Sequence, residues 1–256
     1  MVVRSSRGRV ARVPPAVVWH ELECGAYDAD LALWLELAAR ADGPILDIGA
    51  GTGRVARVLA RAGCEVTALE RDSTLLNALR AASGELAIEC VRADARAFSL
   101  PRRDYGACIV PMHTIQLLGN EEQRGAFLRC AHAHLRPRGL LGVALLPDAE
   151  PFDVALGHVG PVPESKTVDG LRFISTPTRV TVAPDAIVIE RERGIRPLAE
   201  RCESSVTPTL ERDVLARVSA SQLHAEAGAA GFARVSTRRV RATEEHVGSD
   251  VVIARA

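Results

Sequence analysis

Three glycines at alternate positions follow an apolar run and an acid in the segment Ile45-Leu-Asp-Ile-Gly-Ala-Gly-Thr-Gly-Arg54. Because Gly49, Gly51 and Gly53 carry no side chains, a ligand can lie directly against the backbone there. If the apolar run is a strand and a helix starts after the glycines, the ligand also lies near the positive end of that helix. The segment therefore predicts a binding loop whose ligand contains a nucleoside.

The spacing of this loop disfavours a dinucleotide. The fingerprint G-x-G-x-x-G needs its third glycine at the position of Arg54, and Asp47 lies just ahead of the first glycine. An acid followed by G-x-G-x-G resembles motif I of the class I methyltransferases, which use S-adenosylmethionine. The resemblance spans residues 26–256 and is strongest over 45–140. It implies methyl transfer to nitrogen or oxygen of an acceptor, leaving S-adenosylhomocysteine.

Two further acids follow the next two expected strands. Glu70 lies about 20 residues past the glycines, where a carboxylate can accept hydrogen bonds from both ribose hydroxyls. Asp94 ends the third expected strand. Ligands of open α/β sheets bind at the carboxyl ends of the strands, so Asp47, Glu70 and Asp94 are expected at one edge. Singly, Glu70 or Asp94 could be a solvated charge beside Arg71 or Arg96, but together the acids favour a nucleoside cofactor.

The resemblance also implies individual roles. In the family, the acid matching Asp47 lies near the methionine amino group, and the acid matching Asp94 faces the exocyclic amine of adenine beside the amide of Ala95. Tyr27 falls where many members place an aromatic ring over the methionine tail, although a core-edge tyrosine explains it equally well. The expected cofactor-binding residues are Tyr27, Asp47, Gly49, Ala50, Gly51, Gly53, Glu70, Arg71, Asp94, Ala95, Pro111 and Met112.

The segment Pro111-Met-His-Thr-Ile-Gln-Leu-Leu118 follows the fourth expected strand, where the class I fold runs between methyl donor and acceptor. His113 is the candidate catalytic residue, as a base for the acceptor's proton. The alternative is a histidine at a helix entry whose ring caps a backbone group. A base is not essential, because transfer from a sulfonium depends mainly on in-line placement and dehydration.

The acceptor is expected to be a small molecule. The segment after the fourth strand lacks the N/D-P-P-Y/F motif that is frequent in family members that methylate amides or exocyclic amines. Acidic and basic residues balance at 32 each, which argues against a nucleic-acid partner. Three alternatives stay open: a non-catalytic regulatory or scaffold protein of the same fold that binds the cofactor, an RNA methyltransferase, and an NAD-dependent oxidoreductase.

Cysteine and histidine spacing predicts no metal site. The cysteines form no C-x-x-C pair, and His132 and His134, two apart on one expected helix, cannot face one site and are expected at the surface. No apolar run reaches the roughly 18 residues of a membrane span, and no signal peptide is recognisable. With free cysteines, these features indicate a cytoplasmic protein that does not bind membranes.

Alternating strand and helix patterns position these residues. Strands are expected at 45–48, 65–69, 88–93, 105–110 and 140–146, and helices at 28–41, 55–62, 73–82 and 120–135. Ser73 is the expected cap of one helix, and capping boxes are expected at Asn120 and Ser219. With a last helix and strands at 233–240 and 250–255, the order predicts a doubly wound, Rossmann-like seven-stranded sheet in an α/β protein.

Residues 147–218 interrupt this alternation after the fifth strand. Expected turns at Thr176-Pro177 and Pro184-Asp185 predict antiparallel hairpins. The β-type runs lie near 171–175, 179–182 and 186–192. We expect this insertion to be a lid that binds the acceptor.

The acceptor wall is expected to include Phe152, His158 and Phe173, with several arginines whose charge could suit an acidic metabolite. Residues 1–25 carry four arginines and no acid before Glu21, so they are expected to form a flexible arm. Residues 26–256 are expected to form a single methyltransferase domain.

One segment departs from the family pattern. Leu135-Arg-Pro-Arg-Gly139 stands where the family usually shows L-x-P-G-G, so Arg138 replaces a glycine. An arginine fits there if its φ stays negative. The departure concerns the conformation of a turn and leaves the predicted chemistry unchanged.

Overall fold

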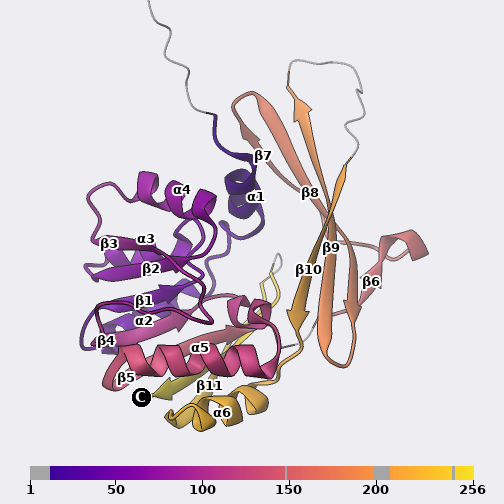
Figure 1. Cartoon of the computed structure of the whole chain (residues 1–256). Coiled ribbons are helices and arrows are strands. Elements are labelled where there is room, and N and C mark those ends of the chain that lie inside the picture. The colour runs from indigo at the N-terminus through magenta and orange to yellow at the C-terminus, as the bar shows by residue number, and fades with distance from the viewer. Residues whose placement is uncertain (1–11, 148, 199–207, 244–245) are drawn as a thin grey trace, which may run out of the picture.

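The larger of two sheets carries the strand that leads into the glycine loop. The computed structural model describes residues 12–147, 149–198, 208–243 and 246–256, and in these ranges the sheet has seven strands, ordered β11-β12-β5-β4-β1-β2-β3. Strands β1 to β5 are parallel, whereas β12 is antiparallel to both of its neighbours. The bounds are β1 Ile45–Ile48, β2 Val66–Glu70, β3 Ile88–Arg92, β4 Tyr105–Val110, β5 Leu135–Leu145, β11 Ala233–Val240 and β12 Ser249–Arg255. The predicted doubly wound α/β sheet is confirmed (Figure 1).

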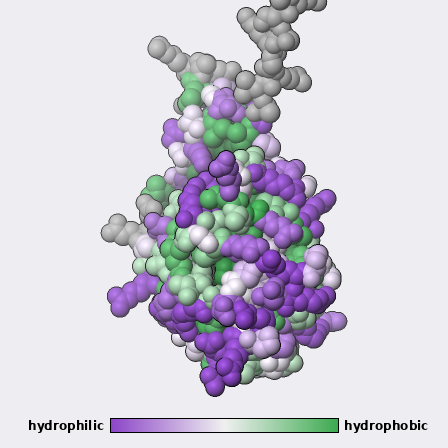
Figure 2. Space-filling view, turned by 90° about the vertical axis from the view of Figure 1, so that its left-hand side faces the viewer, coloured by the Kyte–Doolittle hydropathy of each residue, from purple (hydrophilic) through white to green (hydrophobic). Residues whose placement is uncertain are grey.

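Helices cover both faces of this sheet. Apolar side chains of α2 (Leu31–Arg40), α3 (Arg54–Arg61) and α4 (Ser73–Ser83) are buried on one face, and those of α5 (Glu121–His134) and α6 (Ala220–Ala229) on the other. Each fully buried large aliphatic side chain in these layers contributes roughly 1.5–3 kcal/mol. Within the described residues, no helix is long and apolar enough to cross a membrane. The outer surface seen in Figure 2 has a mainly hydrophilic rim around more hydrophobic groups.

Side-chain caps fix where α4, α5 and α6 start. The capping boxes expected at Asn120 and Ser219 are confirmed. The cap of α4 is Asp72 rather than the expected Ser73, because the Asp72 carboxylate accepts hydrogen bonds from two backbone amides of the first turn, at 2.6 and 3.1 Å. A short 3-10 helix, η1 (Thr114–Leu118), follows β4.

Two residues around the end of α5 differ from expectation. His134 is buried, not at the surface, and its Nε2 accepts a hydrogen bond from the Leu100 amide at 3.0 Å. Arg138 has a φ of +68°, in the left-handed region, whereas a negative φ was expected. The turn is held nonetheless, because the Arg138 amide donates to the carbonyl of Ala256 at 2.8 Å.

The second sheet is the insertion. In the described residues it has five antiparallel strands, ordered β10-β9-β8-β6 with β7 on β8. They are β6 Phe152–Asp153, β7 Glu164–Val168, β8 Leu171–Val182, β9 Ala186–Pro197 and β10 Thr209–Ala216, with the 3-10 helix η2 Val154–Leu156 after β6. The expected turn at Pro184-Asp185 joins β8 to β9. The turn expected at Thr176-Pro177 is wrong, because β8 continues past Pro177 through a register shift.

An additional helix, α1 (Pro15–Glu23), lies between the two sheets in Figure 1 and contacts both parts. The flexible arm expected over residues 1–25 is therefore wrong for this stretch, while residues 1–11 lie outside the described residues. Val18, Trp19 and Leu22 bury their side chains against the insertion sheet. Pro15 at the first helical position is the sequence signal that favours this helix.

Candidate functional site

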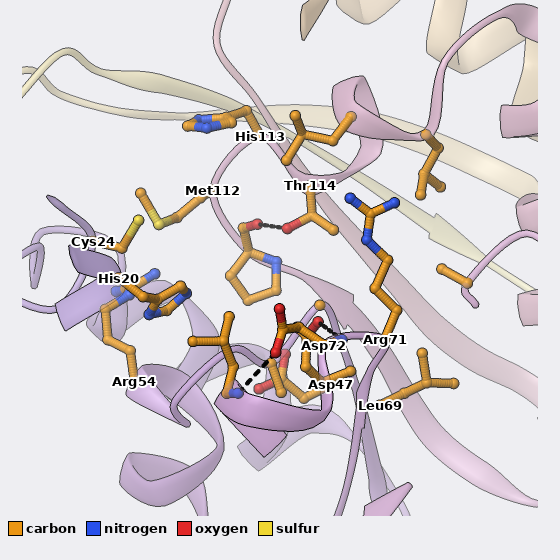
Figure 3. Close-up of a pocket in the computed structure, with 18 of the residues that line it drawn as sticks. His20, Cys24, Asp47, Arg54, Leu69, Arg71, Asp72, Met112, His113 and Thr114 are labelled. Atoms are coloured by element: carbon orange, nitrogen blue, oxygen red, sulfur yellow. Dashed lines mark hydrogen bonds between the residues drawn. The ribbon is translucent and has the colours of Figure 1, made fainter. Parts of the chain in front are cut away.

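A cavity of about 480 Å³ lies at the carboxyl ends of β1, β2 and β4. Its volume is within the range of small-molecule sites. Four parts of the chain line it: α1, the glycine loop, the segments after the strands, and β9 with β10. In Figure 3, His20, Cys24 and Arg54 approach from one side, Arg71 from the opposite side and His113 from above.

The glycine loop brings bare backbone to the base of this cavity. Gly49 has a φ of +68°, and a Cβ there would stand 2.5 Å from a Thr114 methyl carbon, so only glycine fits. Gly49 and Ala50, both expected to bind the cofactor, line the cavity. Gly51 and Gly53 shape the loop without lining the cavity, because the His20 ring covers Gly51.

Glu70 lies at the end of β2, where the sequence placed it, and lines the cavity. Its Oε2 accepts a hydrogen bond from the Gly51 amide at 3.0 Å, and its Oε1 accepts one from the Asp72 amide at 2.8 Å. These bonds fix the carboxylate against the loop. Because each carboxylate oxygen has two lone pairs, Glu70 can accept further hydrogen bonds from a ligand.

Asp47 is a buried carboxylate without a partner. Its side chain lines the cavity, the residue is 1% exposed, and neither oxygen has a hydrogen-bond partner among the described residues. Burial raises the pKa of Asp47 to about 7, against the attraction of Arg54. A buried polar group without a partner is costly, so this arrangement fits a ligand that brings a cationic donor.

Asp94 and Ala95 line the cavity at the end of β3, together with Arg71. Both Asp94 oxygens are engaged by Arg96: Nε donates to Oδ1 at 2.9 Å and Nη2 to Oδ2 at 2.5 Å. These hydrogen bonds hold the pKa of Asp94 down at about 2. The predicted third acid is thus at the expected edge, but it forms a pair with Arg96.

Tyr27 does not line the cavity. Its ring is buried under the Arg54 guanidinium, 5.1 Å from the ring centroid, and its edge meets His246. Arg54 lines the cavity itself and lies between the ring and the ligand space. Tyr27 was expected either to cover the methionine tail of the cofactor or to be a core-edge tyrosine, and this geometry favours the core-edge tyrosine.

Pro111, Met112 and His113, the expected cofactor-binding and catalytic residues after β4, line the cavity. The His113 ring makes no hydrogen bond to the described residues, so it does not cap a backbone group. Burial lowers the pKa of His113, while nearby Asp213 raises it and Arg191 lowers it. The imidazole is therefore neutral at neutral pH and has a free lone pair.

Residues that the sequence did not single out complete the cavity. Trp19, His20, Glu23 and Cys24 come from α1, and Arg193, Glu211 and Asp213 come from β9 and β10. His20 lies against the glycine loop, with Nδ1 3.3 Å from the Thr52 hydroxyl. Burial lowers the pKa of His20 although Glu21 raises it. Two sequence features could have identified these residues: Pro15 at a helix start, and the alternation of charged residues along β9 and β10.

The insertion forms one wall of the cavity, but not with the residues expected. Phe173 packs edge-on against Trp19, with ring centroids 5.0 Å apart, and His158 accepts a hydrogen bond from the Asp153 amide. Phe152, His158 and Phe173 do not line the cavity. Charged side chains of β9 and β10 take their place.

Comparisons with known proteins support the fold and identify a family for residues 45–139. Residues 45–139 match the protein family described as a methyltransferase domain. CalS10, an amino pentose methyltransferase from Micromonospora echinaspora, superposes with a TM-score of 0.69 at 20% identity, covering 93% of this chain and 96% of that chain. The sugar N-methyltransferase KedS8 from Streptoalloteichus gives 0.68 at 15% identity, covering 100% and 98%.

CcbJ, a methyltransferase from Streptomyces caelestis, gives a TM-score of 0.64 at 19% identity, covering 90% of this chain and 97% of that chain. Curated protein sequences give no significant match. Residues 45–139 therefore match a methyltransferase-domain family, and over nearly the whole chain the fold is that of solved methyltransferase structures.

Proposed function

We propose that this protein transfers a methyl group from S-adenosylmethionine to a nitrogen of a small-molecule acceptor. One observation carries the proposal: the buried, unpartnered Asp47 carboxylate lies beneath a bare glycine loop, next to a Glu70 carboxylate fixed by backbone amides. When bound, S-adenosylmethionine supplies a methyl group activated by a positively charged sulfur.

The residues fit this cofactor part by part. Asp47 matches the methionine amino group, because an ammonium would satisfy its orphaned oxygens. Glu70 keeps lone pairs for the ribose hydroxyls. Ala95 and Asp94 lie at the next strand end for the adenine, as the family resemblance implies.

Two observations support nitrogen as the atom that accepts the methyl group. CalS10 is an amino pentose methyltransferase and KedS8 a sugar N-methyltransferase, and both share this fold over nearly the whole chain. A neutral His113 can accept the proton that an acceptor nitrogen gives up. The cavity walls from α1 and the insertion hold the acceptor in place, and in-line placement is what this reaction needs most.

Ligand-dependent thermal unfolding tests the cofactor assignment. S-adenosylhomocysteine at about 100 times its dissociation constant stabilises a binding protein by roughly 2.7 kcal/mol, a shift of a few degrees in Tm. We expect this shift for the wild type, its loss in Glu70→Gln and its retention in Glu85→Gln, an exposed control acid.

A shift with NAD alone would contradict the proposal. Formation of S-adenosylhomocysteine with an amine acceptor separates an enzyme from a non-catalytic binding protein. Cofactor binding without turnover on any amine would favour the latter.

A further inference from the structure

The face of the insertion sheet that meets the cavity carries opposite charges on adjacent strands. Arg191 and Arg193 alternate along β9, and Glu211 and Asp213 alternate along β10. Glu211 is the register partner of Arg191, so the four side chains share one face. Glu23 of α1 lies against this face. We call these five residues the charged wall.

The charges of this wall do not balance. Glu23 accepts hydrogen bonds from Arg193 at 2.8 and 2.6 Å and lies 3.3 Å from Arg191. Arg193 also pairs with Glu211 at 3.1 Å. Asp213 is left with one contact, 3.8 Å from Arg191. Three carboxylates therefore face two guanidinium groups, and Asp213 is the least compensated.

Asp213 is available to a ligand. It lines the cavity, its side chain is 42% exposed, and it forms no hydrogen bond to the described part of the chain. His113 lies close enough that Asp213 acts on the pKa of its imidazole. Asp213 therefore reaches the part of the cavity next to the segment after β4.

The whole cavity favours cations. Its acids outnumber its bases, and the buried Asp47 in the same cavity has no partner among the described residues. The acids are Glu23, Asp47, Glu70, Asp72, Asp94, Glu211 and Asp213, and the bases are Arg54, Arg71, Arg96 and Arg193. The sequence-based expectation of an acidic acceptor is not supported, because the insertion's arginines at the cavity are already paired with acids.

We propose, on the basis of the methyltransferase function proposed above, that Asp213 binds the ammonium of a cationic amine acceptor, with Glu211 adding to the negative potential. The bound ammonium gives up one proton to the neutral His113 imidazole in the same cavity before its nitrogen attacks the methyl carbon. Asp213 is thus a specificity-determining residue that distinguishes an amine from the matching alcohol or amide. A charge-assisted hydrogen bond changes affinity by roughly 10- to 100-fold, which is enough for this discrimination.

Titration calorimetry with saturating S-adenosylhomocysteine tests the proposal. The probes are methyl glycosides of an amino pentose and of an amino hexose, each compared with its N-acetyl derivative and its parent alcohol. We expect the wild type to bind at least one amine at least 10-fold more tightly than both counterparts. Asp213→Asn should lose this preference, and Glu192→Gln, an exposed acid of the same sheet, should keep it.

Binding of S-adenosylhomocysteine is measured first in every variant, so the two proposals can fail separately. If the wild type does not bind S-adenosylhomocysteine, the proposed function is wrong, and this inference fails with it. If it binds S-adenosylhomocysteine but shows no amine preference, or if Asp213→Asn keeps the preference, only the role of Asp213 is wrong.

Discussion

The Asp30 carboxylate and the Arg54 guanidinium form a buried two-bond ion pair, Nη1 to Oδ1 at 2.6 Å and Nη2 to Oδ2 at 2.8 Å. The side chains are 1% and 9% exposed, respectively. Trp34 also donates to Asp30, and the Tyr27 carbonyl accepts from Arg54. The residue that breaks the dinucleotide pattern therefore ties the first turn of α3 to the start of α2.

Breaking this pair should destabilise the fold. Arg54→Met leaves the Asp30 charge buried and unpaired, and we expect the free energy of unfolding in urea to fall by roughly 3–5 kcal/mol. The double variant Asp30→Asn/Arg54→Met should recover part of this loss, because no charge is then left unpaired. A loss below about 1 kcal/mol in Arg54→Met would contradict this account.

Asp47 should make stability depend on pH. Its folded pKa of about 7 lies above the usual 3.8, so between these values the folded state holds a proton that the unfolded state has lost. Stability from this group falls as pH rises towards 7 and stays reduced above it. From pH 5.5 to 8, the wild type should lose roughly 2 kcal/mol more than Asp47→Asn. Urea unfolding at both pH values measures this difference, and parallel changes in the two proteins would refute it.

Relief of the left-handed backbone at Arg138 should stabilise the protein. A non-glycine residue there costs roughly 1–2 kcal/mol, and glycine gives back part of the gain through its larger unfolded-state entropy. We expect Arg138→Gly to raise the free energy of unfolding by roughly 0.5–1 kcal/mol. Arg138→Ala removes the same exposed side chain but keeps the backbone strain, so it should give no such gain.

Glu23 should hold α1 on the insertion. It accepts hydrogen bonds from Arg193 and from the Ser175 hydroxyl. Burial by itself would raise the pKa of Glu23, but Arg193 and Arg191 outweigh burial and keep it below its usual value. In Glu23→Gln, we expect amide hydrogen exchange across Pro15–Glu23 to accelerate by roughly 10- to 100-fold. Exchange in Glu122→Gln, an exposed acid on α5, should match the wild type.

Local sequence patterns predicted the large sheet because its strands are short apolar runs, its helices have a helical periodicity, and two of them start at capping boxes. They also predicted the positions of Asp47 and Glu70, since an acid near the carboxyl end of a buried strand lies at the ligand-binding edge of the sheet. They missed α1, because its apolar side chains pack against Phe173 and its neighbours in the insertion sheet, far along the chain.

The arrangement of the charged wall depends on the register in which β9 and β10 pair. No local pattern fixes which residue of β9 faces Glu211, so its pairing with Arg191 could not be predicted. Tyr27 was placed by family resemblance alone, and the pattern could not show that Arg54 fills the space beside it. The turn expected at Pro177 failed because a bulge can accommodate proline within a strand.

The position of β12 between β5 and β11 constrains how the protein is made. While the ribosome synthesises the chain from Leu145 to Ser249, the outer edge of β5 has no partner strand. At roughly 5–20 residues per second, this exposure lasts roughly 5–20 s. An unpaired apolar strand edge is a template for aggregation. Expression yield should therefore respond to chaperone supply and slower induction more than to substitutions in the cavity.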